Sequence, residues 1–210
     1  VDSERFQPRE KDSDLLASLN LQDKFVAGYI GTHGMAHALE TLLDAADKLR
    51  SHPNGDRYRI LLLGDGARKR ELVEQAHSRG LDNVIFIDSV SKDEVVRYWS
   101  ILDVSIIHLR KTELFTTVIP SKLFECMGMG IPVLHGVKGE SAEIVEREGV
   151  GIVFEPENAE MLCDSLVSLA DNPARFEQYQ RQGCTAAQKY DRSALALKML
   201  ALIEETAEKK

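Results

Sequence analysis

The main structural signals of this chain lie in Thr117-Val-Ile-Pro-Ser-Lys-Leu-Phe-Glu-Cys-Met-Gly-Met-Gly-Ile-Pro-Val-Leu134. A proline fixes its own φ and keeps the residue before it extended, so a helix is expected to begin after Pro120. The glycines at positions 128 and 130 are expected to close that helix, because glycine readily adopts the left-handed conformation of a helix C-terminus. A short apolar strand, opened by Pro132, is expected over 131–134.

The start of this helix has the features of an anion site. Ser121 is a good N-cap, which leaves the amides of Lys122, Leu123 and Phe124 without intrahelical partners. Such an end attracts anions, phosphate above all. Glu125 shares a helix face with Lys122, so one turn offers bare amides, a cation and a carboxylate, which would suit a diphosphate and a sugar diol. The alternative is a short helix on which Lys122 and Glu125 form an ordinary surface pair.

The composition is that of a soluble globular protein. Hydrophobic residues make up 43% and charged residues 29% of the 210 residues, enough to bury a sizeable core. The net charge is −8 and basic residues form no block, which argues against nucleic acid as a partner. No apolar run approaches the length of a membrane span, and no signal peptide is recognised.

Neither a disulfide framework nor a metal site is indicated. The cysteines, Cys126, Cys163 and Cys184, are widely spaced, which fits a reducing cytoplasm, and Cys126 is interpreted as a packed thiol. No pair of histidines has ligand spacing backed by carboxylates, so no metal is expected. Nothing resembles a Ser-His-Asp or Cys-His arrangement.

Apolar runs alternate with helical periodicity along most of the chain. Strands are expected at 25–30, 58–63, 84–87, 104–107, 131–134 and 151–154. Helices are expected from position 35 to about 49, at 67–79, from a capping box at Ser91-Lys-Asp-Glu94 to 101, after Pro120, and at 141–148, 159–170, 173–189 and 192–208. This alternation predicts βαβ units and an α/β fold, a Rossmann-like three-layer domain with a mostly parallel six-stranded sheet and extra C-terminal helices.

We expect three segments in this chain. Residues 1–23 are interpreted as an interdomain linker with a short helix, 24–190 as the Rossmann-like domain, and 191–210 as a C-terminal helix. The chain has no initiator Met and is expected to be a piece of something longer. Ligands of such sheets bind beyond the carboxyl ends of the strands, so the loops at 31–34, 64–66, 88–90, 108–119 and 135–141 should form one rim.

Two glycine loops on this rim could approach a phosphate closely. Gly31-Thr-His-Gly34 follows the first strand and Gly64-Asp-Gly66 the second, but neither has the G-x-G-x-x-G pattern, so a nicotinamide dehydrogenase is not favoured. Both could also be plain tight turns. His33 and His135 are placed on the rim, where either could touch an anion. Residues 110 and 111 carry cations after the fourth strand, where a solvated loop is the simpler interpretation.

Together the motifs resemble the C-terminal, nucleotide-sugar-binding domain of family 4 retaining glycosyltransferases, in the branch that builds bacterial surface polysaccharides. Such enzymes have the two-domain GT-B fold, and the resemblance covers almost the whole chain. It is carried by Val1-Asp-Ser-Glu-Arg-Phe-Gln-Pro8, Tyr29-Ile-Gly-Thr-His-Gly-Met-Ala36, Leu62-Leu-Gly-Asp-Gly66, Asp103-Val-Ser-Ile-Ile107, Pro120-Ser-Lys-Leu-Phe-Glu125, Gly130-Ile-Pro-Val133, Gly139-Glu-Ser-Ala-Glu-Ile144 and Gly149-Val-Gly-Ile-Val-Phe154.

The resemblance assigns roles to individual residues. Glu125 is similar to the second glutamate of the E-x7-E motif, which holds the nucleotide ribose, whereas Thr117 stands where the first glutamate is usual. The usual phosphate-binding lysine would fall near His37, and Lys122 is expected to supply that charge. The expected nucleotide-sugar site comprises Gly31, Thr32, His33, Gly34, the base-contacting pair Ser89 and Val90, and Ser121, Lys122, Leu123 and Glu125.

The resemblance also implies the reaction. The chain is expected to be the donor-binding half of a glycosyltransferase that moves a sugar from a nucleotide diphosphate sugar, UDP-linked, to a polysaccharide or lipid-linked acceptor. The acceptor site and catalytic groups would lie in an N-terminal domain, so this piece would be inactive alone. No cofactor or metal is expected, and the site is cytoplasmic, at the inner face of a membrane through that domain. The alternatives are a nucleotide-sugar epimerase of related fold and a non-catalytic regulatory module.

Overall fold

The fold is built on a six-stranded sheet in which every neighbouring pair of strands is parallel. The computed structural model describes residues 1–208. The strand order is β3-β2-β1-β4-β5-β6, the doubly wound order of Rossmann folds. The strands are β1 (Phe25–Ile30), β2 (Tyr58–Leu63), β3 (Val84–Ile87), β4 (Val104–His108), β5 (Val133–Gly136) and β6 (Gly151–Val153). The predicted fold class is therefore confirmed, with an entirely parallel sheet.

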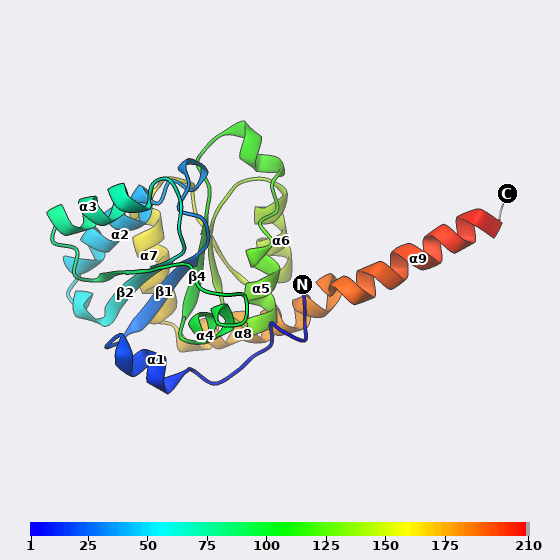
Figure 1. The fold of residues 1–210 in the computed structure, drawn as a ribbon, viewed down its shortest axis with the longest axis horizontal. Coiled ribbons are helices and arrows are strands. Elements are labelled where there is room, and N and C mark those ends of the chain that lie inside the picture. The colour runs from blue at the N-terminus through cyan, green and yellow to red at the C-terminus, as the bar shows by residue number, and fades with distance from the viewer. Residues whose placement is uncertain (209–210) are drawn as a thin grey trace.

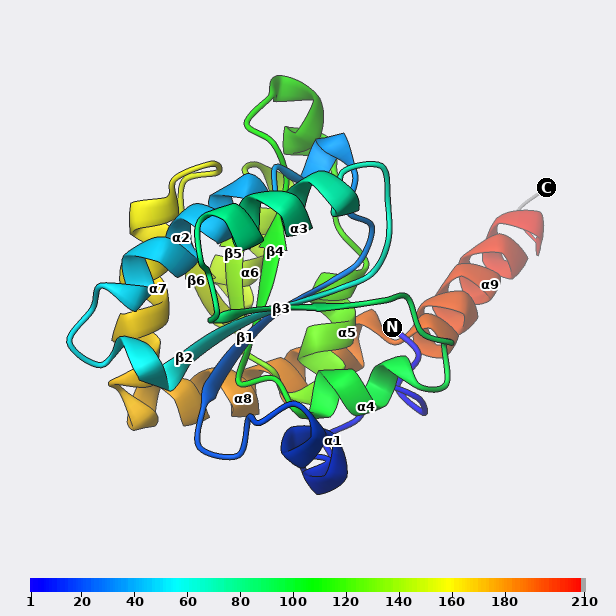
Figure 2. The same ribbon diagram turned by 60° about the vertical axis from the view of Figure 1, so that its left-hand side comes forward.

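Helices cover both faces of this sheet (Figures 1 and 2). One hydrophobic cluster joins the sheet to α2 (Glu40–Arg50), α3 (Lys69–Ser78) and α7 (Ala159–Ala170). The other joins it to α1 (Ser13–Ser18), α4 (Val95–Ser100), α5 (Lys122–Met129) and α6 (Glu140–Glu148), and α8 (Pro173–Ala187) contributes side chains to both clusters. In β1, Ala27 and Tyr29 face the first cluster while Val26 and Ile30 face the second, as the alternation of a strand requires.

The bounds of the first three strands agree with those expected from the sequence, but β5 does not. Its ladder covers Val133–Gly136 rather than 131–134. Pro132 has no amide hydrogen, so its only ladder bond is the one that its carbonyl accepts from the Ser105 amide at 2.9 Å. The strand can therefore pair on both sides only after the proline.

The expected helix starts are found where a side chain caps the first turn. Asn158 and Asn172 accept from the third amide of α7 and α8, and the expected capping box forms, with the Ser91 hydroxyl and the Glu94 carboxylate exchanging bonds with each other's backbone. The expected helix from position 35 is interrupted. A short 3-10 helix, η1 (Met35–His37), ends at Ala38, whose φ of 43° breaks the hydrogen-bond pattern before α2 begins.

The N-terminus packs against the start of α9 (Arg192–Glu208). The Val1 amino group donates to the Tyr190 carbonyl at 2.5 Å, and the Arg192 amide donates to the Val1 carbonyl at 3.0 Å. From there α9 projects away from the domain (Figure 1), with apolar side chains exposed along it. Within residues 1–208, none of the helices combines the length and the apolar character needed to cross a bilayer.

The two glycine loops after β1 and β2 are packed directly on each other. The His33 amide donates to the Asp65 carbonyl at 2.8 Å, and the Arg68 amide donates to the His33 carbonyl at 2.9 Å. Gly64 has a φ of +147°, and a Cβ there would overlap the carbonyl oxygen of Gly31. The loops are therefore one unit, and only a glycine at position 64 permits their approach.

We predict that Gly64→Ala destabilises the domain by about 1–3 kcal/mol, because the Cβ meets backbone that cannot rotate away. The matched control is Gly34→Ala, where the nearest atom lies 3.5 Å from the added Cβ and the effect should stay within about 0.5 kcal/mol. Urea unfolding of both variants measures the difference. Equal midpoints would show that the two loops separate freely.

Candidate functional site

The strand order leaves one place where a ligand can enter between the loops. The connection from β1 runs towards β2, whereas that from β4 runs towards β5, so the loops after β1 and β4 diverge. Ligands of doubly wound sheets bind at this switch point, outside the carboxyl ends of the strands. The segments that border it here are residues 31–39 and 109–121, the second of which leads into α5.

Lys122 projects from the start of α5 into this switch point. A Cβ on Gly31 would lie 2.7 Å from the Lys122 Nζ, so the ammonium rests against the bare backbone of Gly31. The hydroxyl of Tyr29 lies alongside and donates to the Thr32 carbonyl at 2.9 Å, which fixes the loop. Among the described residues, Lys122 has no ion-pair or hydrogen-bond partner, and Glu125 does not pair with it. The surface pair considered from the sequence therefore does not form.

The expectation of three bare amides at this helix start is wrong. Ser121 itself has helical angles, φ −57° and ψ −29°, and makes no side-chain cap bond. As a result the Leu123 amide donates to the Pro120 carbonyl and the Phe124 amide to the Ser121 carbonyl, each at 3.0 Å. Leu123 is also buried in the second hydrophobic cluster. In the part of the chain that the structure describes, only the amides of Ser121 and Lys122 at this end remain without a partner.

Glu125 lines a pocket of about 350 Å³ that Lys122 does not line. Ser121 and Phe124 line the same pocket from α5, and Lys92 and Val95 line it from the loop and helix after β3. Burial raises the pKa of the Glu125 carboxyl, and the nearby Lys122 ammonium opposes that rise. Glu125 is thus a half-buried carboxylate whose hydrogen-bonding capacity no described residue uses.

Two pairs of residues that line this pocket are not predicted by the sequence: Lys92 with Val95, and Arg5 with Phe6. The segment after β3 reaches the pocket through Lys92 and Val95 rather than through the expected Ser89 and Val90. Ser89 is exposed, and Val90 packs on the second cluster. Arg5 and Phe6, from the expected linker, form another wall. No local pattern marks them, because the contact depends on how residues 1–8 pack along α5.

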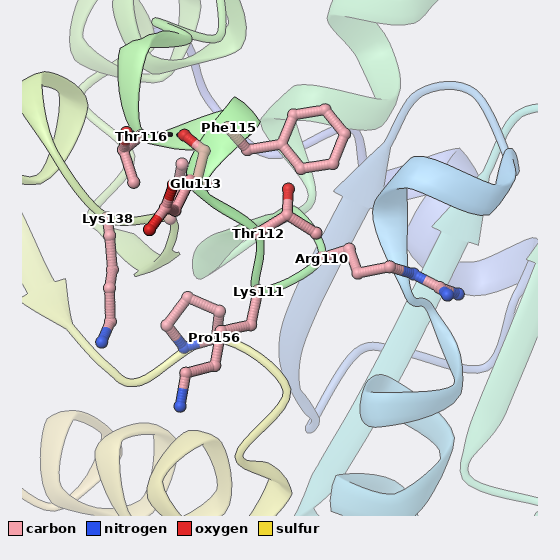
Figure 3. Close-up of a pocket in the computed structure, with 9 residues that line it drawn as sticks. Arg110, Lys111, Thr112, Glu113, Phe115, Thr116, Lys138 and Pro156 are labelled. Atoms are coloured by element: carbon pink, nitrogen blue, oxygen red, sulfur yellow. Dashed lines mark hydrogen bonds between the residues drawn. The ribbon is translucent and has the colours of Figure 1, made fainter.

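A second pocket, of about 300 Å³, is formed by the segments that follow β4, β5 and β6 (Figure 3). It is lined by Arg110, Lys111, Thr112, Glu113, Phe115, Thr116, Val137, Lys138 and Pro156. Glu155 holds the ammonium groups of Lys111 and Lys138 at 2.7 and 2.8 Å. The Arg110 guanidinium is turned away from these lysines (Figure 3), and within the described residues it has no partner. Arg110 and Lys111 therefore line a pocket, rather than only forming the solvated loop expected from the sequence.

The expectation that His33 and His135 lie on the open rim is wrong, because neither ring is exposed. The His33 ring turns inwards towards Tyr29 and Phe86, and neither of its nitrogens has a hydrogen-bond partner in the described structure. The His135 ring lies beside Ser141, with 2.9 Å between Nε2 and Oγ. Thr32 and Gly34 remain accessible at the loop surface. Cys126 is fully buried, as expected, and burial raises its pKa to about 12.

The described residues offer no group of three or more His, Cys, Asp or Glu side chains that could hold a metal. The switch point offers an anion the Lys122 ammonium and the free amides of Ser121 and Lys122. Free amides, an unpaired ammonium and a glycine backbone at one place are suited to phosphate. The half-buried carboxylate of Glu125 on the same helix is suited to hydroxyl donors.

Comparison with known proteins identifies the family to which this chain belongs. Residues 12–189 match the family described as "Glycosyl transferases group 1". The chain belongs to this family.

Two curated glycosyl transferases illustrate the relationship. WcaI of Escherichia coli K12, named as a candidate glycosyl transferase of colanic acid biosynthesis, is 30% identical over 168 residues, which cover 77% of this chain and 40% of that protein. A GDP-mannose-dependent alpha-(1-6)-phosphatidylinositol monomannoside mannosyltransferase of Mycobacterium tuberculosis is 24% identical over 94% of this chain and 52% of its own length. The chain thus spans about half the length of the curated relatives it matches.

Solved structures show the same fold. The crystal structure of Anabaena Alr3699/HepE in complex with UDP has a TM-score of 0.84 at 18% identity, covering 98% of this chain and 56% of that one. The C-terminal domain of LpcC, a group 1 glycosyl transferase from Francisella tularensis, has a TM-score of 0.75 at 20% identity, covering 91% of this chain and 99% of that one. The second comparison matches this chain to a whole C-terminal domain.

We predict that the glycosyl transferase domain loses stability as the pH falls from about 6.5 towards 4. Burial lowers the pKa of both His33 and His135 from 6.5 to about 4. The unfolded chain therefore binds more protons in this window, and stability decreases there by about 2 kcal/mol for each histidine at pH 5. Urea midpoints at pH 7 and pH 5 measure the loss. His135→Gln should lose less stability over this pH range than the parent, because His33, His37 and His108 still contribute. An identical loss would exclude His135 as a source.

Proposed function

We propose that this chain is the donor-binding half of a retaining, family 4 type glycosyltransferase that uses a nucleotide diphosphate sugar, with UDP as the nucleotide. The observation that carries the proposal is the unpartnered Lys122 ammonium, held over the backbone of Gly31 at the switch point of the sheet. In this proposal residues 1–23 are an interdomain linker, 24–190 the donor domain and 191–210 a C-terminal helix, of which 209–210 lie outside the described residues.

The diphosphate is proposed to lie between the loop after β1 and the start of α5. Gly31, Thr32 and Gly34 supply a backbone without bulky side chains on one side, and Lys122 with the Ser121 and Lys122 amides supplies positive charge on the other. His37 stands where the family resembled usually has a phosphate-binding lysine. Burial lowers the pKa of His37, and Lys122 lowers it further, so His37 is a neutral donor or acceptor rather than a replacement cation. Lys122 takes that role.

The ribose is proposed to lie at Glu125, in the pocket of about 350 Å³. Its carboxylate is one turn along α5 from the proposed diphosphate position and is open to two hydroxyl donors. The base then extends towards Lys92 and Val95, which replace the expected Ser89 and Val90 as the nearest residues of the loop after β3. His33 is left out as a direct contact because its ring is buried.

The choice of UDP has support from structural neighbours and opposition from one relative. The HepE structure holds UDP, whereas the mycobacterial relative is named for its use of GDP-mannose. Because structural neighbours bind UDP, we favour a pyrimidine nucleotide. WcaI supports a role in bacterial surface polysaccharides, through its named pathway.

The acceptor and the catalytic groups are proposed to belong to a preceding domain that closes over the same rim. The described residues place no paired acid and base beside the proposed sugar position, which is why an epimerase is the weaker alternative. Thr117, where the family's first glutamate is usual, ends the exposed η3 (Glu113–Thr117) and bonds back to the Leu114 carbonyl. By itself the chain is therefore proposed to bind nucleotide and to transfer no sugar to a polysaccharide or lipid-linked acceptor.

Calorimetric titration with UDP tests the proposal directly. We expect UDP to bind with the same affinity in the presence and absence of EDTA, because Lys122 and helix amides rather than a metal neutralise the diphosphate. GDP serves as the matched competitor and should bind more weakly. Failure to bind either nucleotide would refute a donor-binding role, and loss of UDP binding on chelation would refute the metal-free site.

Two variants on α5 separate the proposed ribose and diphosphate contacts. Glu125→Ala should weaken UDP and UMP binding alike, by about ten- to a hundredfold, because a carboxylate that accepts from two hydroxyls contributes about 1.5–3 kcal/mol. Lys122→Met should weaken UDP much more than UMP, because only UDP carries the second phosphate. Glu146→Ala, an exposed carboxylate on α6, is the control and should change neither affinity. Unchanged UDP affinity in Glu125→Ala would remove Glu125 from the site.

A further inference from the structure

The last residue of β4, His108, lies under the switch point with both ring nitrogens engaged. Its side chain is almost fully buried and its ring is stacked on Phe154, with 5.8 Å between centroids and an interplanar angle of 2°. Nδ1 lies 2.8 Å from the His37 carbonyl oxygen, and Nε2 accepts from the Glu157 amide at 2.9 Å. One imidazole therefore joins η1, which follows β1, to the loop that follows β6.

These two contacts allow only one form of the ring. A carbonyl oxygen can only accept, so Nδ1 must carry the proton, whereas Nε2 must present its lone pair to an amide donor. The neutral Nδ1–H tautomer satisfies both contacts, and the other tautomer satisfies neither. Burial lowers the pKa of His108, which favours the neutral form.

Each contact extends to a loop that borders the candidate site. On one side, the His37 carbonyl belongs to the segment that continues from the glycine loop, and the Arg110 amide donates to Ala36 there at 2.8 Å. On the other side, Glu157 has a φ of 61°, and its carboxylate accepts from the Lys111 amide at 2.6 Å. The loop after β4, which lines the second pocket, is thus held from both directions.

We propose that His108 is a positioning residue that couples the phosphate-side loop, residues 31–38, to the pocket-side loop, residues 155–157, through one tautomer of its imidazole. The nucleotide consequence rests on the proposed donor site, because residues 31–38 would border the diphosphate. The effect of His108 on the two loops themselves does not depend on the proposed donor site. Each ring nitrogen governs one loop, so replacing the nitrogens one at a time should affect the two loops separately.

Two conservative variants provide this separation. His108→Asn keeps an amide donor near the position of Nδ1, and His108→Gln keeps an acceptor near the position of Nε2. Hydrogen exchange of the Glu157 amide should therefore accelerate in His108→Asn and stay close to that of the parent in His108→Gln. In the same proteins UDP affinity should fall about tenfold in His108→Gln and stay within about threefold of the parent in His108→Asn.

The outcomes distinguish this inference from the proposed function. Opposite effects in the two variants support the coupling, whereas equal acceleration at Glu157 in both would reduce His108 to a packing residue and overturn it. If the parent chain binds no UDP, the donor site is wrong, and the exchange of Glu157 alone decides the coupling. Should neither variant fold, the ¹⁵N shifts of the parent's His108 ring remain decisive, since a protonated Nε2 would contradict the proposed tautomer.

Discussion

The pairing of β1 with β4 is the constraint on which the rest of the structure depends. The backbone of Asp103 donates to the Val26 carbonyl at 2.8 Å, and its carboxylate accepts from the Val26 amide at 2.7 Å, so the two strands are closed at their start. Since the connections leave this pair in opposite directions, the loops at its carboxyl end cannot cover each other. Lys122 can reach a ligand there only because that space remains open.

Within this arrangement, glycines let the loops approach each other, and lysines supply positive charge. Gly64 allows the loops after β1 and β2 to approach closely, and the Lys122 side chain fills the place where a side chain on Gly31 would lie. Lysines 111 and 138 both pair with the Glu155 carboxylate, whereas Lys122 has no paired carboxylate among the described residues. A partly exposed, unpaired ammonium next to bare backbone is available to an anion, which is the physical reason for regarding this place as a site.

Local patterns predicted most of the fold, and they placed the glycine loops and the start of α5 at the candidate site. The runs at 25–30, 58–63 and 84–87 could be bounded from sequence because each is apolar and lies between polar or glycine residues. The number of free amides at the start of α5 could not be predicted, because whether Ser121 caps the helix or joins it depends on its backbone angles. Nor could the burial of the His33 ring, which follows from the packing of one glycine loop on the next. The walls that Arg5 and Lys92 add to the Glu125 pocket come from segments distant in sequence.

The position of β1 at the centre of the sheet also bears on how the chain folds. Pairing β1 with β2 closes a single βα crossover, but pairing it with β4 brings together Ala27 and Val104, which are separated by β2, β3 and three helices. Non-local pairings of this kind cost more loop-closure entropy and form more slowly. A nascent or partly unfolded chain can therefore contain β1, β2 and β3 with their glycine loops already packed, and still have no crevice. The binding face exists only in the completed sheet, so recognition of a ligand reports that the whole domain has folded.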